Sequence, residues 1–239
     1  MNADYILRID IKLRIYTPMP PVTPTTNYPM TKETTKEKII SKAIDLYNAE
    51  GFSNITSRDI AKELDMSHGN LEYHYKNKEA VLSAIYDRMK EEVSAYFSET
   101  NKSLHPFEQF NVLLKKLDHF QNKYKFFNLD VVEISRQFPK LRLKVETTAQ
   151  MRKEQMINFF DLFARAGYLK EEPNKGFYLR LQHKIRVLIT FWVSQEAILK
   201  NFDNTQTISM SQSIWDLLVP NFTAKGIKEY TRLINPHTS

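Results

Sequence analysis

Apolar residues recur at intervals of three and four from Thr34 almost to the C-terminus, and this spacing restricts the chain to packed helices. Only five glycines occur among 239 residues, and no sequence period repeats. An apolar share of 42% is enough to build a packed core. We therefore predict an all-α globular protein with little or no β structure.

Residues 1–30 do not share this pattern. Apolar and basic residues alternate between Tyr5 and Ile15, and five prolines follow between Pro18 and Pro29. We expect an extension that is flexible or not native, because Met30 begins the regular part of the chain. The alternative is a basic arm that contacts a DNA backbone or pairs between subunits.

The composition excludes several functional classes. The chain has no cysteine, which excludes disulfides, thiolate nucleophiles and zinc sites built on sulfur, and which fits a reducing cytoplasm. The longest apolar run, around residues 187–193, is far shorter than the roughly 20 residues of a membrane span. We find no nucleophile with its base, no paired carboxylates and no phosphate-binding glycine loop. We expect a cytoplasmic protein that is not an enzyme, with no catalytic residues, metal, cofactor or membrane partner.

Net charge gives only weak support for nucleic-acid binding. The whole chain carries +6, yet residues 31–80 hold eight Lys/Arg against nine Asp/Glu and so carry −1. The basic excess lies outside the segment that has the strongest DNA-binding pattern. The case for DNA therefore rests on local geometry.

That segment, residues 56–79, is TSRDIAKELDMSHGNLEYHYKNKE. Thr56 and Asp59 have capping-box spacing before one short helix, and a tight turn at residues 65–67 separates it from a second short helix that ends near His74. Neither helix is long enough to be stable alone, so both must share a small core with the helix that begins after Thr34. This is the pattern of a helix-turn-helix.

The packing that this core requires leaves one face of the second short helix exposed. Its hydrogen-bonding and aromatic side chains suit base edges and phosphates, and Lys78 at a helix start suits a phosphate. We predict ten DNA-binding residues: Thr56, Ser57, Arg58, Ser67, His68, Gly69, Asn70, Tyr73, His74 and Lys78.

The segment resembles the TetR family of regulators, whose pattern is T-x-R-D-I-A-x-x-L followed by G-x-L-Y-x-H-F-x-x-K-E. The matching residues are Thr56, Arg58, Asp59, Ile60, Ala61, Leu64, Gly69, Leu71, His74, Lys78 and Glu79. The resemblance implies a three-helix DNA-binding head at residues 31–80. It also implies a fourth helix that joins the head to a helical effector-binding and dimerisation domain at residues 81–239. Such a protein represses transcription by binding a near-palindromic operator on double-stranded DNA as a homodimer.

Several positions have alternatives. Asp65 stands where glycine is common in the turn, and Asp tolerates the left-handed backbone. Glu72 replaces a tyrosine that contacts phosphate in the family, so it must pair with a neighbour or turn away. Tyr75 is read as core rather than contact, and Arg58 either touches phosphate or forms a solvated pair with Asp59.

A metal site at His68 and His74 is disfavoured, because a spacing of six places them on different faces of a helix. DNA contact is the reading that we prefer for both histidines.

Beyond residue 100 the spacing predicts helices at 104–121, 124–138, 140–166, 176–200, 208–219 and 223–234. The helix at 176–200 is apolar nearly all round and must be buried between partners. By resemblance, residues 176–219 build the dimer interface, and we expect Ile185 or Trp192 to Glu to give monomers.

A cluster of aromatic and polar side chains predicts a pocket for a small hydrophobic effector. The predicted ligand-binding residues are Phe127, Gln155, Phe159, Phe163, His183, Phe191 and Trp192. The alternative is an aromatic core that needs no ligand. The alternative function is a helical dimer that has lost DNA binding and acts as a ligand carrier or protein-interaction module.

Overall fold

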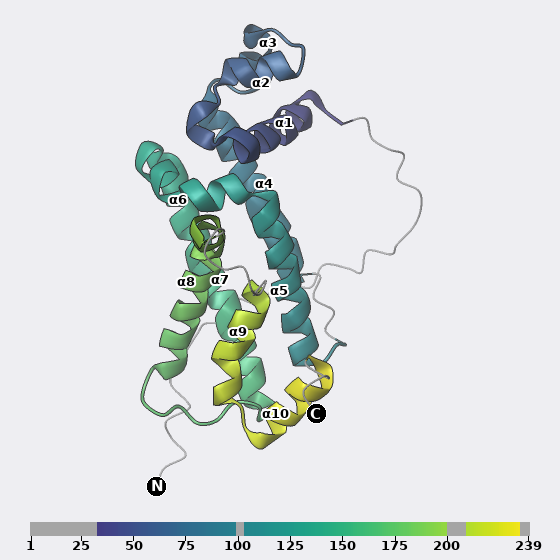
Figure 1. Cartoon of the computed structure of the whole chain (residues 1–239), viewed down its shortest axis with the longest axis vertical. Helices are drawn as coiled ribbons and strands as arrows, with labels where there is room; N and C mark the ends of the chain where they lie inside the picture. The colour runs from purple at the N-terminus through teal and green to yellow at the C-terminus, as the bar shows by residue number, and fades with distance from the viewer. Residues whose placement is uncertain (1–32, 99–102, 200–208, 235–239) are drawn as a thin grey trace, which may run out of the picture. The chain divides into compact units, whose positions relative to one another are not determined.

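The computed structural model describes residues 33–98, 103–199 and 209–234, and the chain from Thr34 onward forms one compact unit. The predicted extension at residues 1–30 lies outside the described residues. The described residues form ten α-helices and two 3-10 turns (Figure 1). They are α1 (Thr35–Glu50), η2 (Phe52–Asn54), α2 (Ser57–Glu63), α3 (His68–His74), α4 (Lys78–Ser98), α5 (Pro106–Lys123), α6 (Lys125–Gln137), α7 (Pro139–Arg165), α8 (Phe177–Leu199), α9 (Met210–Leu218), η3 (Val219–Asn221) and α10 (Ala224–Leu233).

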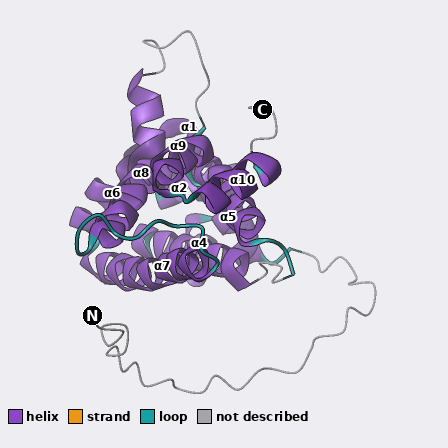
Figure 2. Ribbon diagram, turned by 90° about the horizontal axis from the view of Figure 1, so that it is seen from below, coloured by secondary structure: helices purple, strands orange, loops and turns teal. Residues whose placement is uncertain are grey.

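The all-α prediction is confirmed. Each helix predicted beyond residue 100 is present, with ends within two residues of the expected ones wherever the structure describes them. The predicted ends at residues 200 and 208 lie outside the described residues. Within the described ranges β structure is limited to one isolated bridge between Leu169 and Phe222, and Figure 2 shows helices joined by loops. None of the described helices is long and apolar enough to cross a membrane.

The start of each early helix follows from its capping residue. Thr34 accepts a hydrogen bond from the Glu37 amide at 3.2 Å, and the Glu37 carboxylate accepts one from the Thr34 amide at 2.7 Å. Asn77 caps α4 by accepting from the Ala80 amide at 2.9 Å. Both caps satisfy amides that have no partner within the helix.

Two buried clusters hold the helices together. The first joins the head to α4, α6 and the start of α7, so that Phe126, Ile134 and Leu141 share a core with Ile39 and Leu71. The head is therefore packed directly on the larger helical part. The second cluster joins α5, the end of α7, α8, α9 and α10. Its centre is a set of aromatic rings at 4.9–5.6 Å separation: Phe107, Phe110, Phe163, Trp215 and Phe222.

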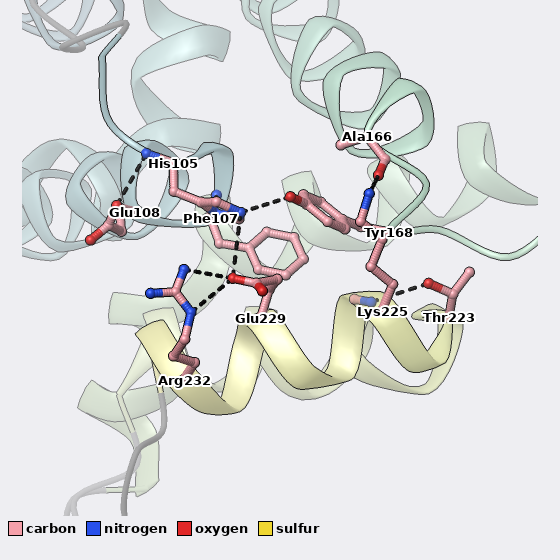
Figure 3. Close-up of polar contacts among 10 residues, drawn as sticks. His105, Phe107, Glu108, Ala166, Tyr168, Thr223, Lys225, Glu229 and Arg232 are labelled. Atoms are coloured by element: carbon pink, nitrogen blue, oxygen red, sulfur yellow. Dashed lines mark hydrogen bonds and ion pairs between the residues drawn. The ribbon is translucent and has the colours of Figure 1, made fainter.

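His105 ties the start of α5 to α10 and to the loop that follows α7 (Figure 3). Its Nδ1 accepts from the Phe107 amide at 3.2 Å, so the neutral ring carries its proton on Nε2, which lies 2.8 Å from the Tyr168 hydroxyl. Glu229 lies 3.8 Å from the same Nε2 and pairs with Arg232 at 2.6 Å. The cap thus depends on a neutral histidine.

Burial lowers the pKa of His105, and the positive charges of Arg232 and Lys225 act in the same direction, against Glu229 and Glu108. A lowered folded pKa means that the unfolded chain binds the proton first as pH falls below about 6.5. The stability that neutral His105 contributes is therefore present above that pH and is lost as pH falls through the folded pKa.

We expect His105→Asn, which keeps a capping acceptor but cannot titrate, to reduce the fall in Tm between pH 7.5 and pH 5.0. Thermal unfolding followed by circular dichroism measures this fall. His119→Asn, at an exposed position of α5, is the matched control and should leave the fall unchanged. An equal fall in His105→Asn and the unaltered chain would contradict the role of His105.

Candidate nucleic-acid interface

The helix-turn-helix is formed by α2 and α3. The Thr56 hydroxyl caps α2 by accepting from the Asp59 amide at 3.3 Å, and it donates to the Asp59 carboxylate at 2.6 Å. The Asp59 carboxylate also accepts from the Thr56 amide at 2.8 Å, and these hydrogen bonds lower the pKa of Asp59. Asp59 is thus used as a cap, which leaves Arg58 exposed beside it and without an ion pair among the described residues.

The turn between the two helices has the conformation expected of its sequence. Asp65 has a φ of 51°, the left-handed conformation predicted at this position. The Met66 amide then donates to the Ala61 carbonyl at 3.0 Å, and Ser67 caps α3 by accepting from the Asn70 amide at 3.1 Å. Ile60, Ala61 and Leu71 are buried, which gives the two short helices the shared core that they require and fixes α3 against α1 and α2.

One face of α3 is left without protein contacts. The Tyr73 side chain is 86% exposed, Ser67 and Asn70 are exposed, and His68 and His74 are half-buried. A Cβ added at Gly69 would meet no atom within 4 Å. Figure 1 shows α3 and α2 on the side of α1 that faces away from the larger helical part. This face can therefore approach a large partner such as DNA.

Glu72 lies within reach of a neighbouring histidine. Its Oε1 is 3.7 Å from Nε2 of His68, one helical turn earlier, and both side chains are partly exposed. A protonated His68 would neutralise the carboxylate at the position where the family has a tyrosine. Tyr75, in contrast, packs against the first buried cluster, as the core reading of this residue predicts.

Lys78 lies differently from the expected phosphate clamp. Its ammonium donates to the Phe52 carbonyl at 2.5 Å and lies 4.0 Å from the centre of the Phe52 ring. Burial lowers the pKa of Lys78, while Asp130 and Asp59 oppose the shift. Here the ammonium ties the start of α4 to η2, because the fold brings a carbonyl within reach. The side chain is half-buried, and its ammonium is engaged by Phe52.

A second site is a cavity of about 500 Å³, partly open to solvent and lined by residues of α4, α5, α6, α7 and α8. Of the predicted ligand-binding residues, Phe127 and His183 line it. Gln155 accepts from the Arg152 guanidinium at 2.8 Å, and Arg152 does line the cavity.

The other predicted ligand-binding residues lie outside the cavity. Phe159 and Phe163 are buried in the second cluster, Trp192 packs against that cluster, and Phe191 is 46% exposed. The structure thus brings only part of the predicted set to one cavity.

Three amide side chains with buried polar atoms in the lining of this cavity were not predicted from the sequence: Gln121, Asn128 and Gln182. Gln121 and Gln182 are more than nine-tenths buried, and the side-chain oxygen of each has no protein partner. The side-chain nitrogen of Asn128 is also buried without a partner. Nothing in an amphipathic helical pattern marks such residues, because their burial depends on how five helices converge.

The apolar side chains of α8 divide between the protein's own core and its outer surface. Ile185 is fully buried and Leu181 is 4% exposed, so both face the protein's own core, and a glutamate at Ile185 would disturb the fold rather than only a contact between subunits. The apolar residues of α9, predicted to share the interface, are also buried in that core. The exposed apolar residues of α8 are Leu179, Val187, Phe191, Ile198 and Leu199.

Comparison with known proteins agrees with this geometry. Residues 39–85 match the model of bacterial regulatory proteins of the tetR family, and residues 88–230 match that of the TetR bacterial transcriptional repressor. The chain is 35% identical over 73 residues to the probable HTH-type transcriptional regulator YttP of Bacillus subtilis, which covers 30% of this chain and 32% of YttP. The chain thus spans about a third of that relative.

Longer matches extend beyond the head. The biofilm operon icaADBC HTH-type negative transcriptional regulator IcaR of Staphylococcus aureus is 23% identical over 163 residues, or 59% of this chain and 87% of IcaR. A crystal structure of a TetR-family transcriptional regulator from Marinobacter aquaeolei superposes with a TM-score of 0.73 at 25% identity, covering 84% of this chain and 97% of that one. The family models together span the head and most of the larger helical part, and the chain belongs to the TetR family of helix-turn-helix transcriptional regulators.

Proposed function

We propose that this chain represses transcription by binding a near-palindromic operator as a homodimer, and that a small ligand in the cavity releases it. The observation that carries the proposal is the exposed face of α3, where polar and aromatic side chains surround a glycine with open space above it. IcaR, which the chain resembles, is described as a negative regulator, and this supports the sign of control.

On α3, the proposed base contacts are made by Asn70, Tyr73 and His74, since amide, hydroxyl and imidazole groups can read base edges in the major groove. Gly69 lets the α3 backbone come close to DNA. Thr56, Ser57, Arg58, Ser67 and His68 supply backbone contacts. Lys78 supports the start of α4 through Phe52 rather than as a free cation.

The proposed dimer contact is the outer face of α8. Val187, Phe191 and Ile198 are spaced by four and seven residues, which places them on one side of the helix, and they are 45%, 46% and 74% exposed. Because these side chains are exposed, they form a row of apolar surface that a partner could cover. A second copy of the chain is the partner that a two-fold operator requires.

Control of DNA binding by a ligand requires contacts that couple the cavity to the head, and α6 makes such contacts. Phe127 lines the cavity and packs on Tyr86 of α4 with ring centres 5.4 Å apart. At the same turn, Asn48 of α1 accepts from the Phe126 amide and donates to the Lys123 carbonyl, both at 2.9 Å. A ligand that shifts α6 would thus shift α1 and the angle of the head.

Footprinting on the DNA upstream of the protein's own gene tests the proposal. We expect protection of two half-sites with centres about 34–36 Å apart along the duplex, or a multiple of that spacing. The rival function, a dimer without DNA affinity, predicts no protection at any concentration. Protection of one isolated half-site would contradict the proposed dimer.

A further inference from the structure

We infer that the cavity binds an amphipathic anion, a molecule with an apolar body and one acidic head group. The inference rests on the proposed function in one respect only, that binding of the ligand regulates binding of DNA. It concerns the chemistry of the ligand, which the cavity lining itself constrains.

The charged residues of the lining all have one sign. Five lysines and arginines contribute to it, together with His183, and no aspartate or glutamate does. The five are Lys90, Arg152, Lys153, Arg180 and Arg186. In a chain with 28 acidic residues against 34 basic ones, such a one-sided lining is not explained by composition. Arg152 and Lys153 are half-buried and the other cations are exposed to solvent, so the lining as a whole favours an anion over a cation.

Arg152 of α7 is the most constrained of these cations. Its guanidinium donates to the Gln155 side chain at 2.8 Å, to the Lys90 carbonyl at 2.9 Å and to the Ser94 hydroxyl at 3.1 Å. It also lies 5.4 Å from the Phe97 ring. These contacts hold the group in place at the cavity, but every acceptor is neutral.

No carboxylate compensates Arg152 among the residues that the structure describes. Partial burial lowers the pKa of the guanidinium, because burial disfavours its charged form. With three hydrogen bonds to neutral partners and no ion-pair partner among the described residues, this guanidinium retains two of its five N–H donors for an oxygen of a carboxylate or phosphate.

The rest of the cavity suits an apolar body. Its walls are mostly aliphatic and aromatic, including Met89, Val93, Phe120, Val131 and Met156. The volume of about 500 Å³ falls within the range of small-molecule sites, roughly 300–1,000 Å³. A hydroxyl group on the ligand, or ordered water, would satisfy the buried side-chain oxygens of Gln121 and Gln182.

Direct titration of the full chain, without DNA, tests the inference. The probes are dodecanoate, dodecyl phosphate, dodecan-1-ol and dodecyltrimethylammonium below their micellar concentrations, and the readout is isothermal calorimetry. We expect at least one of the two anions to bind at least tenfold more tightly than the alcohol, and the cation to bind least. An alcohol or cation that binds as tightly as both anions, or no binding by any probe, would overturn the inference.

Variants test whether the cationic side chains of the cavity cause the preference for anions. Arg152→Gln should weaken anion binding about tenfold and leave binding of dodecan-1-ol unchanged, whereas Arg165→Gln, exposed on the same helix and outside the cavity, should change neither. Lys90→Gln with Lys153→Gln provides a second variant if Arg152→Gln does not fold. Equal losses for the anion and the alcohol in these variants would mean that the cations do not recognise the head group.

The experiments can contradict the inferred ligand class and the proposed function independently of each other. If the chain protects operator DNA but shows no preference for anions, only the inference about the ligand is wrong. If the chain prefers anions but never binds DNA, the inferred ligand class stands and the proposed repressor function is wrong.

Discussion

Replacing Ile185 with glutamate will unfold the protein, whereas replacing Phe191 with glutamate on the same helix will leave it folded and monomeric. Ile185 is fully buried in the second cluster, where a carboxylate would have neither water nor a partner. The cost of such a buried charge is several kcal/mol, set against a typical total stability of about 5–15 kcal/mol. Phe191 is 46% exposed and its replacement removes little from the core.

Thermal unfolding and light scattering together measure this contrast. The unaltered chain should scatter as a dimer, Phe191→Glu as a monomer with a cooperative melt, and Ile185→Glu should show no cooperative melt. Gln150→Glu, exposed on α7, adds one negative charge outside α8 and should remain dimeric. A Phe191→Glu variant that stays dimeric would move the interface away from this face of α8.

The second large effect is expected at Gly69. A leucine there would meet no atom of the protein near its Cβ, so the fold should be retained and α3 should gain helix propensity. On DNA the same side chain would hold the α3 backbone away from the bases. We expect affinity for the upstream DNA to fall about 100-fold, or about 3 kcal/mol at 1.4 kcal/mol per tenfold.

Fluorescence anisotropy with labelled upstream DNA measures this loss. Gly69→Ala should give a smaller loss in the same direction, and Gln150→Leu, which adds leucine at an exposed site on α7, should bind as the unaltered chain does. Undiminished binding by Gly69→Leu would show that the outer face of α3 does not approach DNA.

Local sequence signals predicted the head almost completely. The capping pairs at Thr34 and Thr56, the left-handed turn at Asp65 and the burial of Leu71 follow from residue type and spacing within one or two helical turns. The helices beyond residue 100 were predictable for the same reason, because breakers such as Pro139 and Gly167 lie where they start or end.

Contacts between distant segments were not predictable in this way. The ammonium of Lys78 meets the Phe52 carbonyl only because η2 folds back on α4. The α8 sequence is apolar on nearly every side, so periodicity did not distinguish its core face at Ile185 from its exposed face at Phe191. Arg152 is an ordinary surface residue in the sequence and borders a cavity only once five helices have packed.

Sequence discrimination on DNA tests the central claim, that α3 reads base edges, most directly. The measurement is the ratio of affinities for the upstream DNA and for a shuffled fragment of equal length, at one fixed salt concentration, for the unaltered chain and for Asn70→Ala. We predict a ratio of at least about 1,000 for the unaltered chain and a ratio roughly tenfold lower for Asn70→Ala, with unchanged affinity for the shuffled fragment. Equal affinity of the unaltered chain for the two fragments would contradict the claim.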